Sequence, residues 1–420
     1  MNVKTAISAR NTPFVDTIAS SYQDTYGASL RPQRVAAIAD LESLPFPTSK
    51  SEFWKYTRLG KLTKNNFRFT DDGRIKPKVS AIADANSVLL VFVNGIFEPS
   101  LSDQLPEGVS LELFGASEEF PDKFNALAQP KKHVLEALNT AYCPQTAVLT
   151  VKANSSVDPV IHIAHWSTGE NNISQPRLLV DAKSGSKATV VQSFEGDDQS
   201  GFTNSVAEIF VGANTLLTWF KIESETAQRF HHSADYVRVE GGGHFSILTT
   251  PAGSVWTRNN LNIKLSGSNA FARLNGLCSL KDTQHVDNNT FVDHAVAHCD
   301  SSELYKSILS GQSTCVFNGK VIVRPDAQKT NAFQQNSNLL LSEDAQIYSK
   351  PELEIYADDV KCSHGSTTGQ MDEEAVFYLQ SRAIGKEDAQ RMLLTAFAGE
   401  VLDQAENEAI REHLYQLYTL

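Results

Sequence analysis

Cysteine is scarce in this chain of 420 residues, and the cysteines present are scattered. The five are Cys143, Cys278, Cys299, Cys315 and Cys362. An odd number at irregular spacing does not fit the disulfide framework of a small secreted domain. No two of them form a C-x-x-C pair, which excludes the simplest self-contained zinc and iron–sulfur sites. We therefore expect reduced thiols.

Two common catalytic motifs are also missing. The phosphate-binding loop G-x-x-x-x-G-K-[ST] is absent: Gly319-Lys320 comes closest, but Val321 follows and the upstream spacing is wrong. The nucleophile elbow G-x-S-x-G is absent, because Gly311-Gln312-Ser313-Thr314 is followed by Cys315. We therefore predict that this chain binds no nucleotide itself and is not an enzyme.

The chain has no excess of positive charge and no long apolar run. Its formal net charge of -12 disfavours attraction to the polyanionic backbone of a nucleic acid. No apolar run approaches the roughly 18 to 20 residues that cross a bilayer, and the start Met1-Asn2-Val3-Lys4 lacks a signal-peptide pattern. These absences predict a cytoplasmic protein that binds neither nucleic acid nor membrane.

The residues that are present divide the chain into three zones, beginning with a helical one. Hydrophobic residues make up 41% of the chain and charged residues 20%, which is typical of a folded soluble protein. In about the first 75 residues, apolar positions recur at helical spacing through Ile18, Tyr22, Val35, Ile38 and Leu41. This zone is predicted to be helical.

From about residue 85 to residue 360, the pattern changes to short β-branched runs such as 88–93 and 188–191. Turn glycines such as Gly185, Gly212 and Gly267 precede these runs and recur roughly every 25 to 30 residues, a period within the range of stacked repeats. No helical segments separate the runs, which disfavours a βαβ fold. A β-helix or an irregular β-sandwich fits this pattern, and the helical zones on either side are expected to cap the ends of a β-helix.

The third zone starts near Gly369 and is again helical. Asp372 is predicted to cap a helix that runs to Ile384, and Gly385 to close that helix in the left-handed conformation. A second helix then runs to Leu402. By pattern alone, this helix pair either packs on its own body or forms a docking surface for a partner.

Two small groups of residues have the chemistry of metal ligands. Asp293-His294 and His298-Cys299 form the first, although their surroundings are typical of a strand or a turn. The second is Cys362 with His364, preceded by Asp358-Asp359. In an extended strand, residues two apart project from the same face, and thiolate and imidazole both bind iron or zinc. Two ligands leave a tetrahedral site incomplete, so the other ligands would come from Asp358, from a substrate or from a partner.

Several segments resemble one protein family. Residues 346–365, which end in Lys361-Cys362-Ser363-His364-Gly365, resemble the late region shared by the SufB/SufD family of iron–sulfur cluster assembly proteins. Residues 377–385 resemble the family's Y-L-x-S-R-G-I stretch, with Ala383 where glycine is common, a departure that a helix should accept. Trp54-Lys55-Tyr56-Thr57 resembles an N-terminal element of the family. The sequence at Cys362 and the short chain favour the SufD branch over the SufB branch.

This resemblance implies a mainly β fold and two partners. The implied fold is a right-handed parallel β-helix over residues 81–350, between an N-terminal helical domain (1–80) and an ATPase-docking C-terminal helical domain (351–420). The chain is expected to pair with a SufB-type paralogue through the β-helix ends and to dock a SufC-type ABC ATPase, which supplies ATP hydrolysis. The expected docking residues are Tyr378, Arg382, Ile384, Gly385, Met392 and Phe397.

The resemblance also implies a shared metal site. Cys362 and His364 match by position the family's residues at the SufB interface, where a nascent cluster or incoming iron is held. The implied cofactor is therefore a transient iron–sulfur cluster, or iron, that is shared with the SufB-type partner. A homodimer of the isolated chain is an alternative pairing. Two other functions remain open: a β-helix carbohydrate-active enzyme, and a stand-alone metal-binding protein that uses His294, His298 and Cys299.

Overall fold

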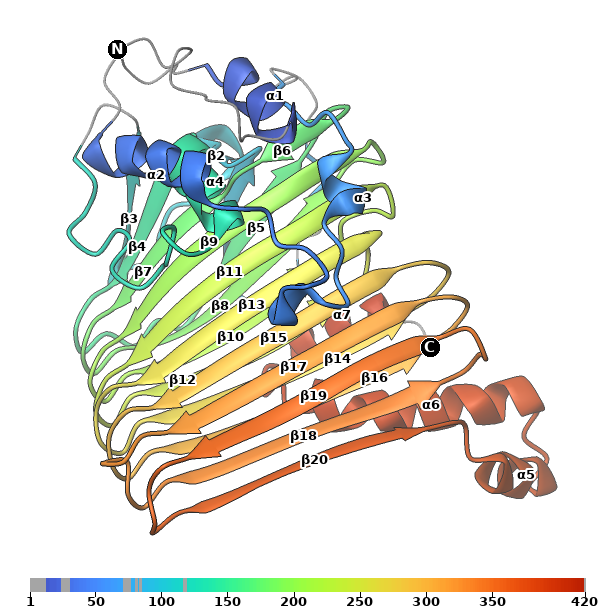
Figure 1. Ribbon diagram of the computed structural model, residues 1–420. Helices are drawn as coiled ribbons and strands as arrows, with labels where there is room; N and C mark the ends of the chain where they lie inside the picture. The colour runs from blue at the N-terminus through green and yellow to red at the C-terminus, as the bar shows by residue number, and fades with distance from the viewer. Residues whose placement is uncertain are drawn as a thin grey trace.

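The fold is a parallel β-solenoid with helices at both ends of the chain (Figure 1). The computed structural model describes residues 13–23, 31–70, 77–79, 82, 85–115 and 119–418. Successive turns of the chain build two facing sheets, and apart from two antiparallel pairs at the start of the solenoid all neighbouring strands are parallel. The predicted fold class is therefore confirmed.

Each sheet has ten strands, and the order of the strands in space follows the coils. The first sheet runs β2 (Ile96–Phe97), β1 (Ser87–Val93), β5 (Val160–Ser167), β8 (Lys187–Gly196), β10 (Leu216–Glu223), β12 (His244–Pro251), β14 (Phe271–Leu280), β16 (Asp300–Leu309), β18 (Asn331–Leu340), β20 (Lys361–Gly369). The second runs β19 (Gln346–Ile355), β17 (Thr314–Val323), β15 (His285–His294), β13 (Trp256–Leu265), β11 (Arg229–Val239), β9 (Gly201–Val211), β7 (Arg177–Ala182), β4 (Thr146–Val151), β3 (Val109–Phe114), with β6 (Asn172–Ser174) paired to β9.

The coil repeat is regular. Leu216 pairs with His244, His244 with Phe271, and Phe271 with Asp300, so these three coils advance the chain by 27 to 29 residues. The turn between β11 and β12 contains Gly242 at a φ of +66°, a left-handed conformation that glycine adopts without steric cost. Most coils fall within the predicted repeat of 25 to 30 residues, and two late coils exceed it, with 31 residues from Asp300 to Asn331 and 32 from Thr314 to Gln346.

The interior of the solenoid changes character along each strand. On β10, alternate residues face inward, beginning with Leu217 and Trp219 in the main hydrophobic core. The same alternation continues through Lys221 and Glu223, which are both buried. The solenoid therefore encloses an apolar half and a polar half.

The N-terminal helices cover one face of the second sheet. They are α1 (Pro13–Ser21), α2 (Pro32–Ser43), α3 (Gly60–Thr63) and α4 (Val134–Tyr142). Phe14, Leu41 and Leu138 from this group pack with Phe202 of β9 and Trp256 of β13 in a second hydrophobic core. Helices are present in the described part of the first zone, as predicted, but extended segments separate them.

The C-terminal helices lie along the outer face of the first sheet. They are α5 (Glu373–Ser381), α6 (Lys386–Leu402) and α7 (Glu408–Leu417). Leu402 and Leu414 pack against Leu248 and Leu277, and the Tyr418 hydroxyl donates to the carbonyl oxygen of Leu277 at 2.7 Å. The sequence predicted that these helices would cap the end of the solenoid. They lie beside the first sheet instead, so they leave the last coil uncovered (Figure 1).

The solenoid strands extend further than the domain boundary that the family resemblance implied, and they end where the residue pattern placed the start of the third zone. Strand β20 ends at Gly369, beyond residue 350, where the C-terminal helical domain was expected to begin. Cys362 and His364 therefore lie on a strand of the solenoid itself. No helix among the described residues is long and apolar enough to cross a membrane.

Candidate functional site

Cys362 and His364 lie on β20, the terminal strand of the first sheet. Cys362 pairs with Ala332 of β18 and His364 with Gln334, so the two side chains project from the same face of the strand. Cys362 is half-buried against the main core, and burial raises the pKa of its thiol. His364 is exposed. The structure therefore brings the predicted pair together at the open end of the solenoid.

Polar residues lie directly behind this pair. The Gln334 amide donates to a carboxylate oxygen of Glu303 at 2.6 Å, and Glu303 pairs in register with Gln334, as Gln334 does with His364. Burial raises the pKa of Glu303 to about 7. Ser349 and Ser366 share a hydrogen bond of 2.8 Å across the two sheets. Below His364, the last coils thus have a hydrogen-bonding interior.

The ligand set at this end is incomplete within the chain. Among the described residues, no group of three or more His, Cys, Asp or Glu side chains is placed to hold a metal ion. Asp359 forms a salt bridge with Lys329, and Asp358 is exposed on the turn before β20. A tetrahedral metal or cluster iron bound by Cys362 and His364 would need further ligands from outside this chain.

The other predicted metal group is not assembled. His294 shares a hydrogen bond of 2.9 Å with Ser301, and burial lowers the pKa of its imidazole to about 4. The Cys299 thiol donates to the carbonyl oxygen of Gly267 at 3.3 Å. His298 occupies a turn with a φ of +62°. His294 and Cys299 each form a local hydrogen bond, and among the described residues no group of metal ligands is assembled here.

The helix pair α5–α6 has a large exposed apolar surface. Phe377 is 72% exposed, Tyr378 58% and Met392 50%. Sequence reasoning selected Tyr378 and Met392 but not Phe377, although two adjacent aromatic residues on one helix were a usable signal. Contiguous exposed apolar residues of this kind mark interaction surfaces.

The other four predicted docking residues have different environments. The Arg382 guanidinium lies over the Tyr378 ring at 5.2 Å and is exposed, while Ile384 is half-buried. Phe397 is half-buried beneath the Lys306 ammonium, which lies 4.2 Å from the ring centroid. Gly385 is exposed between the two helices. Of these residues, Phe397 is the one that packs on the solenoid.

The end of α5 differs from the sequence prediction. Asp372 caps the helix as expected, accepting from the backbone N–H groups of Glu374 and Ala375. Gly385, however, has a φ of −58° and is the N-cap of α6, so it does not close α5. The left-handed residue is Ala383, at a φ of +66°. A left-handed residue cannot continue an α-helix, so α5 ends before Ala383. Glycine adopts this conformation most easily and is the usual residue at such a helix end.

Replacing Ala383 by glycine is expected to stabilise the α5–α6 connection. A left-handed conformation costs an L-residue roughly 1 kcal/mol more than glycine, so local opening should become about fivefold rarer. Hydrogen exchange of the α5 amides measures this opening directly. Ala375→Gly in the middle of α5 is the matched control and should accelerate exchange. Unchanged or faster exchange in Ala383→Gly would contradict the proposed strain.

The interior also holds a buried group of charged residues that sequence reasoning missed. Lys221 lies 2.7 Å from Asp235 and 3.3 Å from Glu223, and His231 lies 3.3 Å from Glu223 and 2.7 Å from Glu225. All five are buried. Alternation between polar and apolar residues on β10 and β11 is normally typical of a strand with one solvated face. Only the closed solenoid shows that these polar residues face inward.

His231 gives the stability of the fold a pH dependence. Burial alone would lower the pKa of its imidazole, but the Glu223 and Glu225 carboxylates raise it to about 9. Because the pKa of this imidazole is higher in the folded than in the unfolded chain, protonation of His231 stabilises the folded state. This stabilisation is complete below the pKa of the unfolded chain and is lost as the pH rises through 9. From pH 7.5 to 9.5, the free energy of unfolding should fall by about 2 kcal/mol on this account.

Urea denaturation at the two pH values measures this fall. Buried thiols such as Cys278, whose pKa is also raised, contribute to the same fall, so the His231→Gln variant is the necessary comparison. The part of the fall that disappears in His231→Gln belongs to His231. An identical fall in both proteins would show that His231 is not responsible.

Comparison with known proteins identifies the family. Residues 165–397 match the sequence profile described as "SUF system FeS cluster assembly, SufBD core domain", and residues 14–163 match "SufBD protein N-terminal region". The chain is 34% identical over 397 residues to the iron–sulfur cluster assembly protein SufD of Escherichia coli (strain K12), covering 92% of each chain.

Two further relatives agree with this match. A SufBD family protein of Synechocystis is 31% identical over 406 residues, covering 91% of this chain and 89% of its own. The protein ABCI7, chloroplastic, of Arabidopsis thaliana is 28% identical over 428 residues, covering 95% and 89%. The alternative of a carbohydrate-active β-helix enzyme has no such support. The chain belongs to the SufB/SufD family of iron–sulfur cluster assembly proteins, in its SufD branch.

Proposed function

We propose that this chain is a non-ATPase scaffold subunit of a cytoplasmic iron–sulfur cluster assembly complex. It pairs with a SufB-type paralogue through the open end of the solenoid and docks a SufC-type ABC ATPase through α5 and α6. Cys362 and His364 contribute to the site of the nascent cluster. The observation that carries this proposal is the incomplete ligand pair on a terminal strand, which calls for a partner to complete it.

The open end has the properties of an interface. Strands β19 and β20 each end a sheet, so their outer edges present backbone N–H and C=O groups to a partner strand. Phe333 is 50% exposed and Tyr356 59% exposed near this end. A partner strand added here would extend the solenoid and place its own side chains beside His364. A second copy of this chain would use the same edge, which supports a homodimer when the chain is isolated.

The α5–α6 pair suits a separate partner. Helix α5 lies beyond the end of β20, and α6 runs from it back along the first sheet (Figure 1). Lys306, on β16, binds the carbonyl oxygen of Phe397 and forms a salt bridge of 2.6 Å with Glu400, which fixes α6 to the body. The exposed aromatic residues of α5 then remain free for an ATPase. Under this proposal, the C-terminal helices dock the ATPase, and the solenoid contributes to the cluster site.

Iron or a nascent cluster is the cargo of this site. Thiolate and imidazole both bind iron well, and Cys362 needs to lose its proton to become a ligand. Because burial raises the pKa of that thiol, metal binding rather than solvent exposure has to drive the deprotonation. No step of this proposal uses a nucleotide bound by this chain.

Co-purification tests the proposal. The tagged chain, expressed with the SufB-type and SufC-type proteins of its own cell, should recover both partners. Phe333→Asp should lower recovery of the SufB-type partner and spare the ATPase, while Phe377→Asp should do the reverse. Failure of the unaltered chain to recover either partner, or equal losses of both partners in each variant, would refute the assignment of the two surfaces.

A further inference from the structure

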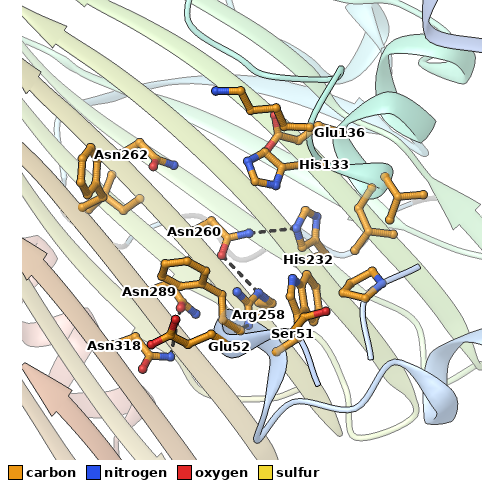
Figure 2. A pocket seen from close by; sticks show the side chains of 18 of the residues that line it. Ser51, Glu52, His133, Glu136, His232, Arg258, Asn260, Asn262, Asn289 and Asn318 are labelled. Atoms are coloured by element: carbon orange, nitrogen blue, oxygen red, sulfur yellow. Dashed lines mark hydrogen bonds between the residues drawn. The ribbon is translucent and has the colours of Figure 1, made fainter. Parts of the chain in front are cut away.

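A large cavity lies between the N-terminal segment and the outer face of the second sheet (Figure 2). Its volume is about 640 Å³. The segment Leu44–Trp54 forms one wall, the start of α4 forms another, and residues from β11 to β19 form the floor. None of the proposed cluster or docking residues lines it. This cavity is separate from the open end of the solenoid.

A row of asparagine side chains crosses the cavity floor. Asn260, Asn289 and Asn318 occupy the same register position on β13, β15 and β17, one per coil. The Asn318 amide donates to the Asn289 amide oxygen at 3.1 Å. Asn260 already bonds His232 and Arg258, and Asn289 donates to Asp287. The atoms left without a hydrogen-bond partner among the described residues are the amide oxygen of Asn318 and both polar atoms of Asn262 in the next row. Asparagine offers one acceptor and a donor group, the same pair as a peptide bond.

The floor is long and narrow. Tyr236, Asn262, Phe291, Lys320 and Glu352 share one register row across five neighbouring strands, and all five line the cavity. Strands lie about 4.8 Å apart, so the row spans roughly 19 Å. An extended chain advances about 3.3 Å per residue, so about six residues would span the floor.

The wall opposite the floor contains backbone groups that are able to form hydrogen bonds with a ligand. Pro45, Phe46 and Pro47 run between α2 and the short 3₁₀ helix Glu52–Trp54, in a stretch without helix or strand structure. Proline has no backbone N–H, so this stretch offers the Phe46 N–H and three carbonyl oxygens, and none of these groups forms a hydrogen bond with described residues. Nearby, Arg258 donates to the carbonyl oxygen of Phe53 at 2.8 Å, so this face of the solenoid already binds the backbone of one irregular segment. Unpaired main chain beside a groove favours addition of another extended chain.

The two ends of the cavity differ in the pairing of their charged side chains. Lys132 and His133 are exposed, line the cavity and form no salt bridge with the described residues. At the opposite end, the charges are already paired: Lys320 with Glu354 at 2.6 Å, and Lys350 with Glu52 at 2.5 Å. Among the described lysine and arginine side chains that line the cavity, Lys132 alone has no salt-bridge partner, and its ammonium is complementary to a carboxylate.

We infer that this cavity binds an extended polypeptide segment of about six residues. The segment places an acidic side chain or terminal carboxylate beside Lys132 and His133. Its peptide groups bond Asn262, the amide oxygen of Asn318, and the Phe46 N–H and free carbonyl oxygens of residues 45–47. A proline or aromatic side chain packs against Phe291 and Trp54. A partner protein supplies the segment, and its carboxylate is complementary to the unpaired ammonium of Lys132.

Peptide selection tests this inference. A phage-displayed library of random linear hexapeptides is selected on the full-length chain, and an enriched sequence is synthesised with a fluorescein label. Fluorescence anisotropy then measures its Kd. Enriched sequences are expected to carry an acidic residue near one end and a proline or aromatic residue within.

Matched variants locate the binding. Lys132→Glu and Asn262→Leu should each raise the Kd at least tenfold, while Lys131→Glu, an exposed neighbour outside the cavity lining, should change it less than twofold. Lys132 is exposed, so its loss leaves folding intact, and circular dichroism verifies both variants. No enrichment, or a Kd that is unchanged in Lys132→Glu and Asn262→Leu, would overturn the inference. So would binding of 8-anilino-1-naphthalenesulfonate in the cavity without any enriched peptide, which would indicate a small-molecule site.

Discussion

Replacing His364 by alanine is expected to lower iron–sulfur cluster formation by the reconstituted complex at least tenfold, while the complex itself still assembles. His364 is exposed on the terminal strand, so its removal leaves the solenoid core intact. It is one of the two side chains, with Cys362, that we propose as ligands at the open end. Loss of a group that binds or orients a metal typically costs 10-fold to 100-fold in affinity or activity.

Cluster formation in this experiment is measured by visible absorption and circular dichroism, and complex formation by size-exclusion chromatography. His244→Ala is the matched control, because His244 is also exposed on a strand of the first sheet but lies far from β20 in the coil order. Cluster formation that is retained in His364→Ala would remove this residue from the site. Loss of the complex itself would instead assign His364 to the interface.

The buried lysine predicts the largest effect on stability. Lys221→Met should lower the free energy of unfolding by about 3 to 5 kcal/mol, since it leaves buried carboxylates without their counter-charge. Burial alone would lower the pKa of the Lys221 ammonium, but Asp235 and Glu223 outweigh burial and raise it. Its ammonium also donates to Ser233, so three buried groups lose a partner together.

The midpoint of urea denaturation, followed by circular dichroism, measures this loss. Lys187→Met is the matched control, because Lys187 begins the neighbouring strand β8 and its side chain is exposed. That control should stay within about 0.5 kcal/mol of the unaltered chain. A Lys221→Met protein as stable as the control would show that the buried carboxylates are protonated or hydrated without the lysine.

At position 383, the glycine that is common in the family indicated the backbone conformation better than helix propensity did. The sequence places alanine where glycine is common in the family, and a helix would accept that change. The structure instead has this position at a φ of +66°, outside the helix, where glycine has a physical reason to be common. Helix ends are decided by a balance of turn and packing energies that one residue's propensity does not show.

The open end of the solenoid shows a similar limit. The residue pattern located Cys362 and His364 on one face of an extended segment, and the register with Ala332 and Gln334 agrees. It did not show that β20 belongs to the solenoid, because Lys361–Gly369 is polar and has little of the apolar alternation of a buried strand. That strand is exposed because no later coil covers it, which is a property of the whole fold.

The sequence by itself determined the coil repeat, the mainly β fold class, the capped helix at Asp372 and the family of the chain. These follow from local chemistry: turn residues, side-chain alternation and helix caps act between residues close along the chain. Only the tertiary structure decided which polar residues are interior, such as Lys221 and His231, and which surfaces are uncovered. It also brought Leu44–Trp54 over the asparagine row to enclose a cavity. Burial depends on contacts between coils and segments far apart in sequence, and no local pattern specifies those contacts.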